Sequence, residues 1–271
     1  MTVVVLVHGR RRYFSAAREA IRSVLVRTPF SVAAVVGPGR GRLWLRSRRI
    51  QRIPVPMPTG AGRAASFLLK FHALRVALEQ TRSSHLLLLD ADAVFAADVE
   101  VADVLDALGS HPIGMVEQTC IRGGEMTTAR LREFAYETML PFFGPVPAEL
   151  SAGDLTYFNS GVVLATREAL GQLTEWALAR IEAHEGPHEV GEHFVGDQDY
   201  FQYWVNVLHP GTCARLPWSW NHCEHWDDPF PRPEAKILHF SNFCNGPRRF
   251  AARRMRAARR GGPRAVEGLR Q

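Results

Sequence analysis

The residues best suited to chemistry in this sequence are two carboxylates, Asp90 and Asp92, which follow the leucine run Leu86–Leu89. Such a run is typical of a buried strand, and α/β sheets bind ligands at the carboxyl ends of their strands. Carboxylates two residues apart on an extended chain point to the same side, and paired oxygen donors suit Mg²⁺ or Mn²⁺. A metal held there can neutralise a diphosphate leaving group. The alternative interpretation is a pair of solvated acids at a strand end.

Four further segments carry polar groups for which the sequence alone favours a structural interpretation. Lys70, one of only two lysines, lies in a helical segment and could be a solvated cation. The segment 159–161 (Asn-Ser-Gly) opens an apolar run, as a strand with a glycine bulge would. Asp197 precedes Gln198 where a helix begins, and an Asp there is commonly an N-cap. His239 ends a predicted strand, and a histidine there is most simply hydrogen-bonded in the core.

These residues would be positioned by an α/β fold. The β-branched runs Val3–Val7 and Ser31–Val36 flank a helical segment, Tyr13–Val26, so the chain opens with a strand–helix–strand unit. The same patterns predict further strands over 86–89, 158–165 and 237–238 and near 43–45, and further helices over 64–80, 101–108, 129–140, 167–183 and 198–207. Residues 117–154 show no strand periodicity and could cover the substrate.

Composition narrows the class of protein. Hydrophobic residues make up 46% of the 271 positions and charged residues 22%, as in a globular protein, and no apolar run approaches the roughly 20 residues of a membrane span. Residues 1–63 hold thirteen Arg against one acid, and residues 248–271 hold nine Arg against one, whereas the segment between them is acidic. A uniformly basic nucleic-acid-binding surface is therefore not expected. The apolar run Val3–Val7 is too short for a signal-peptide core, so we expect a cytoplasmic location. The four cysteines form no C-x-x-C pair and are there most simply reduced thiols.

The order of five motifs resembles that of the family 8 glycosyltransferases. They are Lys70-Phe71-His72-Ala73-Leu74, the leucine run with Asp90-Ala91-Asp92, Phe158-Asn159-Ser160-Gly161-Val162, Gly196-Asp197-Gln198-Asp199, and His239-Phe240 followed by Gly246-Pro247. The resemblance covers roughly residues 3–250. It implies a single GT-A (Rossmann-like) domain over residues 1–247 with a mixed, mostly parallel central sheet, followed by an Arg-rich tail, 248–271.

The resemblance also implies roles for individual residues. Asp90, Asp92 and His239 would hold Mn²⁺ or Mg²⁺. A UDP-sugar donor would be bound by Val7, Gly9, Tyr13, Lys70, Asp90, Ala91, Asp92, Asn159, Ser160, Gly246 and Arg248. Tyr13 would stack on the uracil, with Ser23 beside the nucleotide, and Asp197 and Gln198 would line the reacting face of the sugar. The implied activity is hexosyl transfer with retention of anomeric configuration. We expect the acceptor to attack on the face that the diphosphate leaves.

Other interpretations remain open at this level. A sugar-nucleotide nucleotidyltransferase shares such a sheet, although the first strand lacks that class's Gly-rich phosphate loop. A non-catalytic protein could instead contact membranes through the basic tail, for which we expect a solvated or disordered segment. The cluster Asn221-His222-Cys223-Glu224-His225 could suggest zinc, but a polar acceptor-cleft loop with Trp218, Trp220 and Trp226 is the preferred interpretation. The acceptor, a small molecule or glycan, and the oligomeric state are left unassigned.

Overall fold

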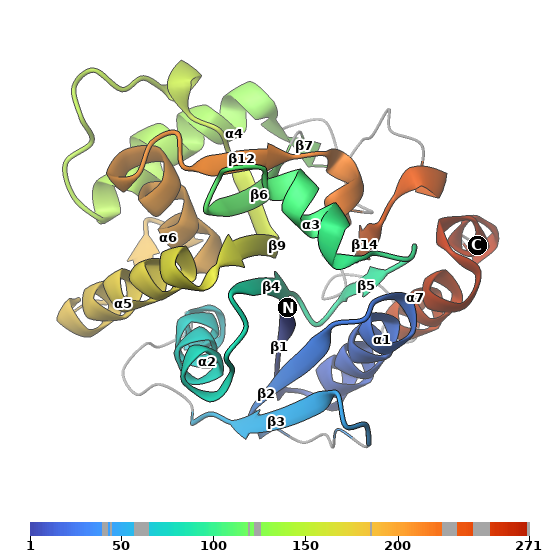
Figure 1. The fold of residues 1–271 in the computed structure, drawn as a ribbon. Helices are drawn as coiled ribbons and strands as arrows, with labels where there is room; N and C mark the ends of the chain where they lie inside the picture. Colours follow the sequence, from blue (N-terminus) through green and yellow to red (C-terminus); the bar gives the residue numbers. More distant parts are fainter. Residues whose placement is uncertain are drawn as a thin grey trace.

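The centre of the molecule is a seven-stranded sheet with the order β12-β6-β9-β4-β1-β2-β3 (Figure 1). Strands β1 to β4 of this sheet run parallel, as do β6 and β12, whereas β9 is antiparallel to both of its neighbours. The sheet is therefore mixed and mostly parallel, as predicted. Its strands are β1 (Thr2–Gly9), β2 (Ser31–Gly39), β3 (Ile50–Pro54), β4 (His85–Leu89), β6 (Ile113–Glu117), β9 (Phe158–Thr166) and β12 (Cys213–Leu216).

The computed structural model describes residues 1–39, 43, 45–56, 65–118, 120–121, 126–184, 186–223, 232–240 and 250–269. A smaller sheet in these residues has the order β13-β14-β5 and lies beside the carboxyl end of β4. Its strands are β5 (Ala93–Phe95), β13 (His222–Cys223) and β14 (Ile237–His239). Two short ribbons pair β7 (Cys120–Ile121) with β8 (Met126–Thr127) and β10 (Glu189–Val190) with β11 (His193–Phe194).

Helices cover both faces of the main sheet. Alternating side chains of the parallel strands divide the core in two: Val3 and Val5 pack on the side of α1, whereas Val4 packs on the side of α2. One face carries α1 (Arg11–Arg27), α3 (Val101–Leu108) and α7 (Phe250–Gly261). The other carries α2 (Ala65–Gln80), α4 (Thr128–Phe134), α5 (Arg167–Ala183) and α6 (Asp197–Tyr203). Shorter helical turns lie at 135–139, 140–142, 152–154, 204–208, 218–220, 232–234 and 263–269.

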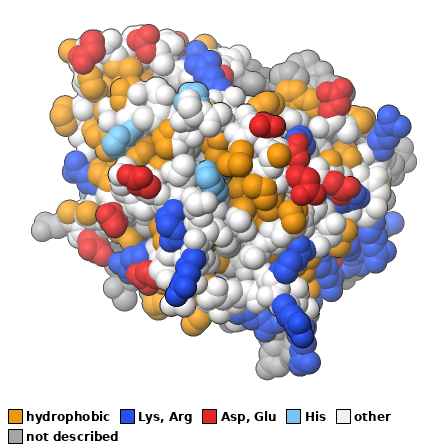
Figure 2. Space-filling view, in the orientation of Figure 1, with side chains coloured by type: hydrophobic (Ala, Val, Ile, Leu, Met, Phe, Trp, Pro, Cys, Tyr) orange, Lys and Arg blue, Asp and Glu red, His pale blue; other side chains and the backbone are white. Residues whose placement is uncertain are grey.

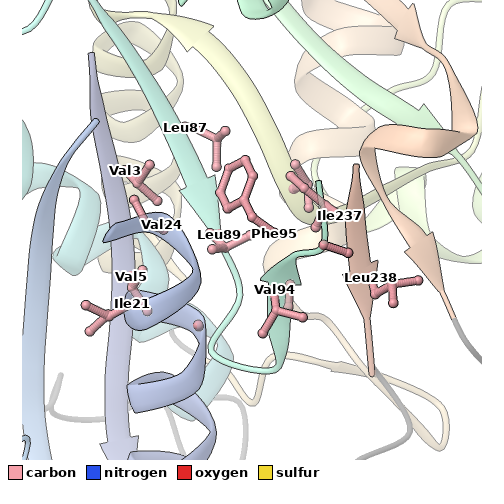
Figure 3. Close-up of a cluster of buried hydrophobic side chains, with 14 of the residues drawn as sticks. Val3, Val5, Ile21, Val24, Leu87, Leu89, Val94, Phe95, Ile237 and Leu238 are labelled. Atoms are coloured by element: carbon pink, nitrogen blue, oxygen red, sulfur yellow. The ribbon is translucent and has the colours of Figure 1, made fainter. Parts of the chain in front are cut away.

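The small sheet is anchored to the main core through β5. Figure 3 shows Phe95 pointing toward Leu87 and Leu89 of β4, with Ile237 of β14 on its other side. All four side chains are fully buried, and each contributes about 1.5–3 kcal/mol of apolar burial. The chain that follows the two candidate carboxylates is therefore held by packing on both sides.

Several predicted elements need correction. The predicted strand near 43–45 is wrong, since Leu43 and Leu45 are buried in irregular chain; Trp44 lies outside the described residues. The sequence patterns missed β3, β6 and β12, which are short strands at or next to the sheet edges. The helix predicted over 129–140 ends as α4 at Phe134 and continues as a π-helical turn, Ala135–Met139. By contrast, α3 and α5 begin and end at the predicted residues.

The Arg-rich C-terminal segment differs from the solvated tail that we expected. Helix α7 packs along α1, with Met255 and Ala258 fully buried in the core. Figure 2 shows Lys and Arg side chains gathered at the edge of the molecule where α7 lies. The apolar stripe of α7 therefore faces inward, while Arg253 and Arg260 remain exposed. No helix among the described residues has both the length and the apolar character needed to cross a membrane.

Candidate active site

The three candidate metal ligands meet where the two sheets join. Asp90 and Asp92 leave the carboxyl end of β4, and the chain then enters β5, which pairs antiparallel with β14. His239 is the last residue of β14, and the next residue, Phe240, donates its backbone N–H to the carbonyl of Asp92 over 3.0 Å. The β5–β14 pairing thus brings His239 from far along the chain to the two carboxylates.

The geometry of this group fits a divalent cation. The Nε2 atom of His239 lies 3.3 Å from Oδ1 of Asp92 and 3.7 Å from Oδ2 of Asp90. One ligand atom from each of the three residues lies within 4.8 Å of the others. Two carboxylate oxygens and one imidazole nitrogen form a donor set suited to Mn²⁺ or Mg²⁺. The predicted ligands are therefore brought together.

Lys70 of α2 reaches the candidate metal ligands from the face of the main sheet that does not carry α1. Its Nζ lies 2.9 Å from Oδ1 of Asp90, forms an ion pair with Asp197, and donates to the carbonyl of Ser160 over 3.3 Å. The side chain is buried, so the solvated cation considered from the sequence is wrong. Burial lowers the pKa of Lys70, but the charges of Asp197 and Asp90 outweigh it and raise the pKa above its ordinary value. Lys70 therefore links a candidate metal ligand to a candidate catalytic carboxylate.

Burial also acts on the acids and the imidazole of the site. It raises the pKa of Asp90, although the charges of Lys70 and His239 act in the opposite direction. Burial lowers the pKa of His239, but hydrogen bonds and charges from Cys223 and Asp92 outweigh it and raise that pKa well above its ordinary value. A cation in the site would oppose proton uptake by these groups.

The first residues of β9 form a network of amides with the start of α6. Asn159 Nδ2 donates to Oε1 of Gln198 and to Oε1 of Gln118, each over 3.3 Å. The hydroxyl of Ser160 donates to Oδ2 of Asp197 over 2.8 Å. The candidate residues from two separate motifs therefore contact each other directly. Sequence reasoning missed Gln118, because nothing in the pattern around it distinguishes it from other polar residues.

Gly161 allows a close approach of β9 to the metal ligand. Its carbonyl accepts the backbone N–H of Asp90 over 2.8 Å, which holds the end of β4. A Cβ atom at this position would lie 2.1 Å from Cε1 and 2.6 Å from Nδ1 of His239. No side chain can occupy that space without displacing the imidazole. The position of His239 therefore requires a glycine here, and the predicted irregularity is also present, because the pairing of β9 with β6 shifts register between Asn159 and Val163.

The residues predicted to bind the donor at the first strand lie at the end of β1. Gly9 has φ +79°, and a Cβ there would lie 3.7 Å from the ring of Tyr13, so the aromatic residue lies against the strand end. Val7 is buried within β1 and Ala91 is half-buried between the two carboxylates. Because β1 and β4 run parallel, the end of β1 lies at the same edge of the sheet as Asp90. Gly246 and Arg248 lie outside the described residues.

Ser23 does not lie beside a nucleotide site. Its hydroxyl donates to the carbonyl of Ala20 over 2.6 Å and accepts the backbone N–H of Phe95 over 2.9 Å. The side chain is fully buried between α1 and β5. Its role in the structure is to join the helix to the small sheet, and the implied nucleotide contact is wrong.

The cluster considered for zinc or for an acceptor cleft has a different role. Asn221 is fully buried, and its Oδ1 lies 3.0 Å from Nδ1 of His239. The thiol sulfur of Cys223 lies 3.4 Å from the same nitrogen. Trp220 is buried beneath Lys236, so the preferred interpretation of an acceptor-cleft loop is wrong for this tryptophan. Glu224, His225 and Trp226 lie outside the described residues.

The sheet order, the flanking helices and the placement of the acidic motif at the end of β4 together define the fold class: a GT-A-type nucleotide-diphospho-sugar transferase fold. The chain is similar to the crystal structure of the galactosyltransferase LgtC in complex with donor and acceptor sugar analogues. The TM-score is 0.58 and the identity 15%, over 96% of this chain and 95% of that chain. The predicted resemblance in fold is therefore confirmed.

Two further solved structures share the fold. The bifunctional glycosyltransferase WbbM matches with a TM-score of 0.56 and 15% identity over 89% of this chain and 46% of that chain. Mouse xyloside xylosyltransferase 1 matches with a TM-score of 0.50 and 17% identity over 91% of this chain and 99% of that chain. No protein-family model and no curated protein sequence matches the chain.

Proposed function

We propose that this protein is a metal-dependent glycosyltransferase that moves a hexosyl group from a UDP-sugar to a small-molecule or glycan acceptor, with retention of anomeric configuration. One observation carries the proposal: Asp90 lies within ion-pair distance of Lys70 and beside His239, while Lys70 also pairs with Asp197. Lys70 thus contacts both a candidate metal ligand, Asp90, and the carboxylate that we place beside the donor sugar, Asp197. This arrangement suits a reaction in which a diphosphate departs from a sugar.

Asp90, Asp92 and His239 would hold Mn²⁺ or Mg²⁺. The cation would supply positive charge for the departing diphosphate. Lys70 already lies in the site and would add a second positive charge to the same group, with Arg248 as a further candidate. Ala91, Val7 and Gly9 would form the backbone floor of the donor site, and Tyr13 would stack on the uracil.

The engagement of Asp197 supports the same-face route for retention. Oδ2 of Asp197 accepts from Ser160 and pairs with Lys70, which lowers the nucleophilicity of this carboxylate. No second carboxylate of the matched motifs would be left as a general acid, since Asp90 and Asp92 would hold the metal. We therefore assign Asp197 to orienting sugar hydroxyls and Gln198 to stabilising positive charge at the ring, with Asn159 and Ser160 holding them. Mass spectrometry during turnover tests this assignment. A sugar adduct on Asp197, or a β-linked product from an α-linked donor, would contradict it.

The remaining assignments concern the setting of the reaction. We propose a catalytic domain over 1–247 and a cytoplasmic protein that binds no nucleic acid. The exposed arginines of the C-terminal segment, including Arg253 and Arg260, would allow peripheral contact with anionic membranes. Sedimentation with vesicles containing anionic lipid tests that contact, and loss of sedimentation at high salt would support it.

The decisive experiment is a thermal-shift screen of nucleotide sugars with and without Mn²⁺, followed by product analysis. A ligand that binds only the folded state raises the melting temperature. We expect a UDP-sugar to do so only with the metal, and hydrolysis or transfer to release UDP. Release of pyrophosphate would instead indicate a nucleotidyltransferase. Full activity in excess chelator would overturn the metal role.

Two matched variants make this experiment specific. Asp92→Asn removes one charged ligand and should abolish the metal-dependent shift. Asp98→Asn is its control, because Asp98 is exposed and pairs only with Arg27 among the described residues. For the nucleotide, Tyr13→Ala should weaken UDP binding by about 1–3 kcal/mol and Tyr13→Phe by much less. Equal losses from the two Tyr13 variants would contradict stacking.

A further inference from the structure

The amide of Asn221 lies between two groups of the candidate site. It is fully buried at the end of the short turn 218–220. Its Nδ2 lies 2.8 Å from Oδ1 of Asn159, and its Oδ1 lies 3.0 Å from Nδ1 of His239. One side chain therefore touches both the candidate metal ligand and the amide that contacts Gln198.

The direction of these hydrogen bonds is fixed by the backbone. The N–H of Gly161 points at the amide of Asn159 over 2.9 Å, and a backbone N–H can only donate. The atom of Asn159 that faces it must be the oxygen. The group of Asn221 that contacts the same oxygen must then be its NH₂, which leaves the Asn221 oxygen facing His239.

This direction determines which nitrogen of His239 carries a hydrogen. An amide oxygen cannot donate, so Nδ1 of His239 must be the donor. The sulfur of Cys223, 3.4 Å from the same nitrogen, can also accept from it. The hydrogen on Nδ1 leaves the lone pair of the neutral ring on Nε2, the atom that faces Asp90 and Asp92. Only that form of the neutral ring can bind a metal at this place.

We propose that Asn221 is a positioning residue, which holds His239 with Nδ1 protonated and Nε2 directed at the metal position, and which ties that ligand to Asn159. The proposal rests on the metal site of the proposed function. Groups that hold a metal-bound histidine through its second nitrogen commonly change metal affinity by about 10–100-fold when they are removed. Asn221 occupies this position and reaches the catalytic amides through the same side chain.

The test uses two substitutions of the same residue. Asn221→Leu removes both hydrogen bonds. Asn221→Asp keeps an acceptor for Nδ1 but loses the NH₂ that donates to Asn159. The hold on His239 would therefore be rescued in this variant, whereas a purely structural role would be damaged by the buried charge. The control is Asn206→Leu, because Asn206 is another enclosed asparagine with several hydrogen bonds, to Thr156 and Gln202, away from the candidate metal group.

Two measurements read the result. Mn²⁺ binding is titrated by electron paramagnetic resonance on protein without donor or acceptor. The Nδ1–H resonance of His239 is followed by NMR on metal-free protein, at a pH at which the ring is neutral and Nε2 gives no N–H signal, and it is assigned by its loss in His239→Ala. We expect Asn221→Leu to weaken Mn²⁺ binding about 10–100-fold and to lose the protected Nδ1–H signal. We expect Asn221→Asp and Asn206→Leu to retain the signal and to bind Mn²⁺ within about threefold of the unmodified protein.

Contrary outcomes are equally defined. Unchanged Mn²⁺ binding together with an unchanged Nδ1–H signal in Asn221→Leu would overturn the proposal. If Asn221→Leu does not fold, loss of the signal in folded Asn221→Asp would overturn it, and retention would support it. If the unmodified protein binds no Mn²⁺, the metal role in the proposed function fails. The NMR comparison would still decide whether Asn221 fixes the hydrogen on Nδ1.

Discussion

Two clusters of buried charge, one on helix α1 and one at the carboxyl end of β4, are balanced differently. On α1, the side chain of Glu19 is only 2% exposed and is contacted by Arg22, Arg256 and Arg259. At the end of β4, Asp90, Asp92 and Asp197 share one lysine and one imidazole. Counted over the described residues, the first cluster has more positive than negative charge, and the second has the reverse.

The difference indicates two kinds of role. A buried acid that is fully surrounded by cations holds two segments together, here α1 and α7, and needs nothing further. A group of acids with too few cations is costly when empty and favours an added positive charge. We infer that the Glu19 cluster is structural, whereas the cluster at the end of β4 is arranged for a ligand.

The largest expected effect comes from replacing Lys70. Lys70→Met removes the one cation that touches both Asp90 and Asp197, so the carboxylates repel and the diphosphate loses a partner. We expect turnover to fall about 10²–10³-fold, the range found when a single charge-stabilising donor is removed. The measurement is UDP release at saturating donor and Mn²⁺, on protein whose folding is checked by circular dichroism.

The only other lysine in the sequence supplies the matched control. Lys236 forms an ion pair with Asp103 over 2.6 Å at the surface, with 29% of its side chain exposed. Lys236→Met should leave turnover within about twofold, because exposed pairs contribute little. Equal activity of the two variants would show that Lys70 serves packing and not chemistry.

Glu19→Gln tests the other cluster and should affect stability but not chemistry. Removing one partner of a buried ion pair costs about 3–5 kcal/mol, but Arg22 and Arg256 are 42% and 52% exposed and can be hydrated instead. We therefore expect the free energy of unfolding to fall by about 2 kcal/mol in urea titrations. Turnover of the folded protein at low temperature should be unchanged. A large loss of turnover would instead connect α1 and α7 to the reaction.

Much of the fold was predictable, because the spacing of apolar residues along a long segment indicates which of its faces is buried. Helix α5 has a long helical pattern, and the leucine run of β4 is short and is bounded by Asp90-Ala91-Asp92, as buried strands commonly are. Strands β6 and β12 were missed, because each is short and pairs with segments far away in sequence. The packing of α7 was missed for a related reason: its few apolar residues indicate a helix face only when the partner surface of α1 is known.

The candidate site shows the same limit at the level of single residues. Asp90, Asp92 and His239 could be named from motif order, and the structure brings them together. Asn221 stood out in the sequence only as part of a cluster that suggested zinc. Its contact with His239 depends on the pairing of β13 with β14, which local sequence does not encode. A polar residue that hydrogen-bonds to a metal ligand, as Asn221 does to His239, stands at no characteristic sequence distance from that ligand.

Asp199 extends the comparison, because it is a buried acid that forms no ion pair with any residue in the described part of the chain. It accepts the N–H of Gly196 over 2.8 Å, and burial raises its pKa from 3.8 to about 7. The folded protein therefore keeps a proton that the unfolded chain has released between these pH values. Stability from this group is fully present below about pH 4 and is lost as pH rises through 7.

Asp199→Asn keeps an acceptor for Gly196 without the titrating charge. Relative to the unmodified protein, we expect this variant to gain about 1–2 kcal/mol in the free energy of unfolding between pH 5 and pH 7.5. Urea titrations at several pH values give the result. A difference between the two proteins that is independent of pH, or that falls as pH rises, would show that Asp199 is ionised at the lower pH and that another group stabilises its charge.

The smallest effects concern the individual arginines around Glu19, and their order tests whether burial decides their contribution. Arg259 is 12% exposed and donates from Nε to Oε2 of Glu19 over 3.1 Å, whereas Arg256 is 52% exposed and donates to Oε1 over 3.3 Å. We expect Arg259→Gln to lower the free energy of unfolding by about 1 kcal/mol and Arg256→Gln by about 0.3 kcal/mol, because water and salt screen the exposed pair. Raising the salt concentration should reduce the smaller loss further and leave most of the larger one. Equal losses that disappear together at high salt would mean that the Glu19 cluster behaves as a surface ion-pair network. The cluster at the end of β4 would then be the only one of the two that behaves as buried charge.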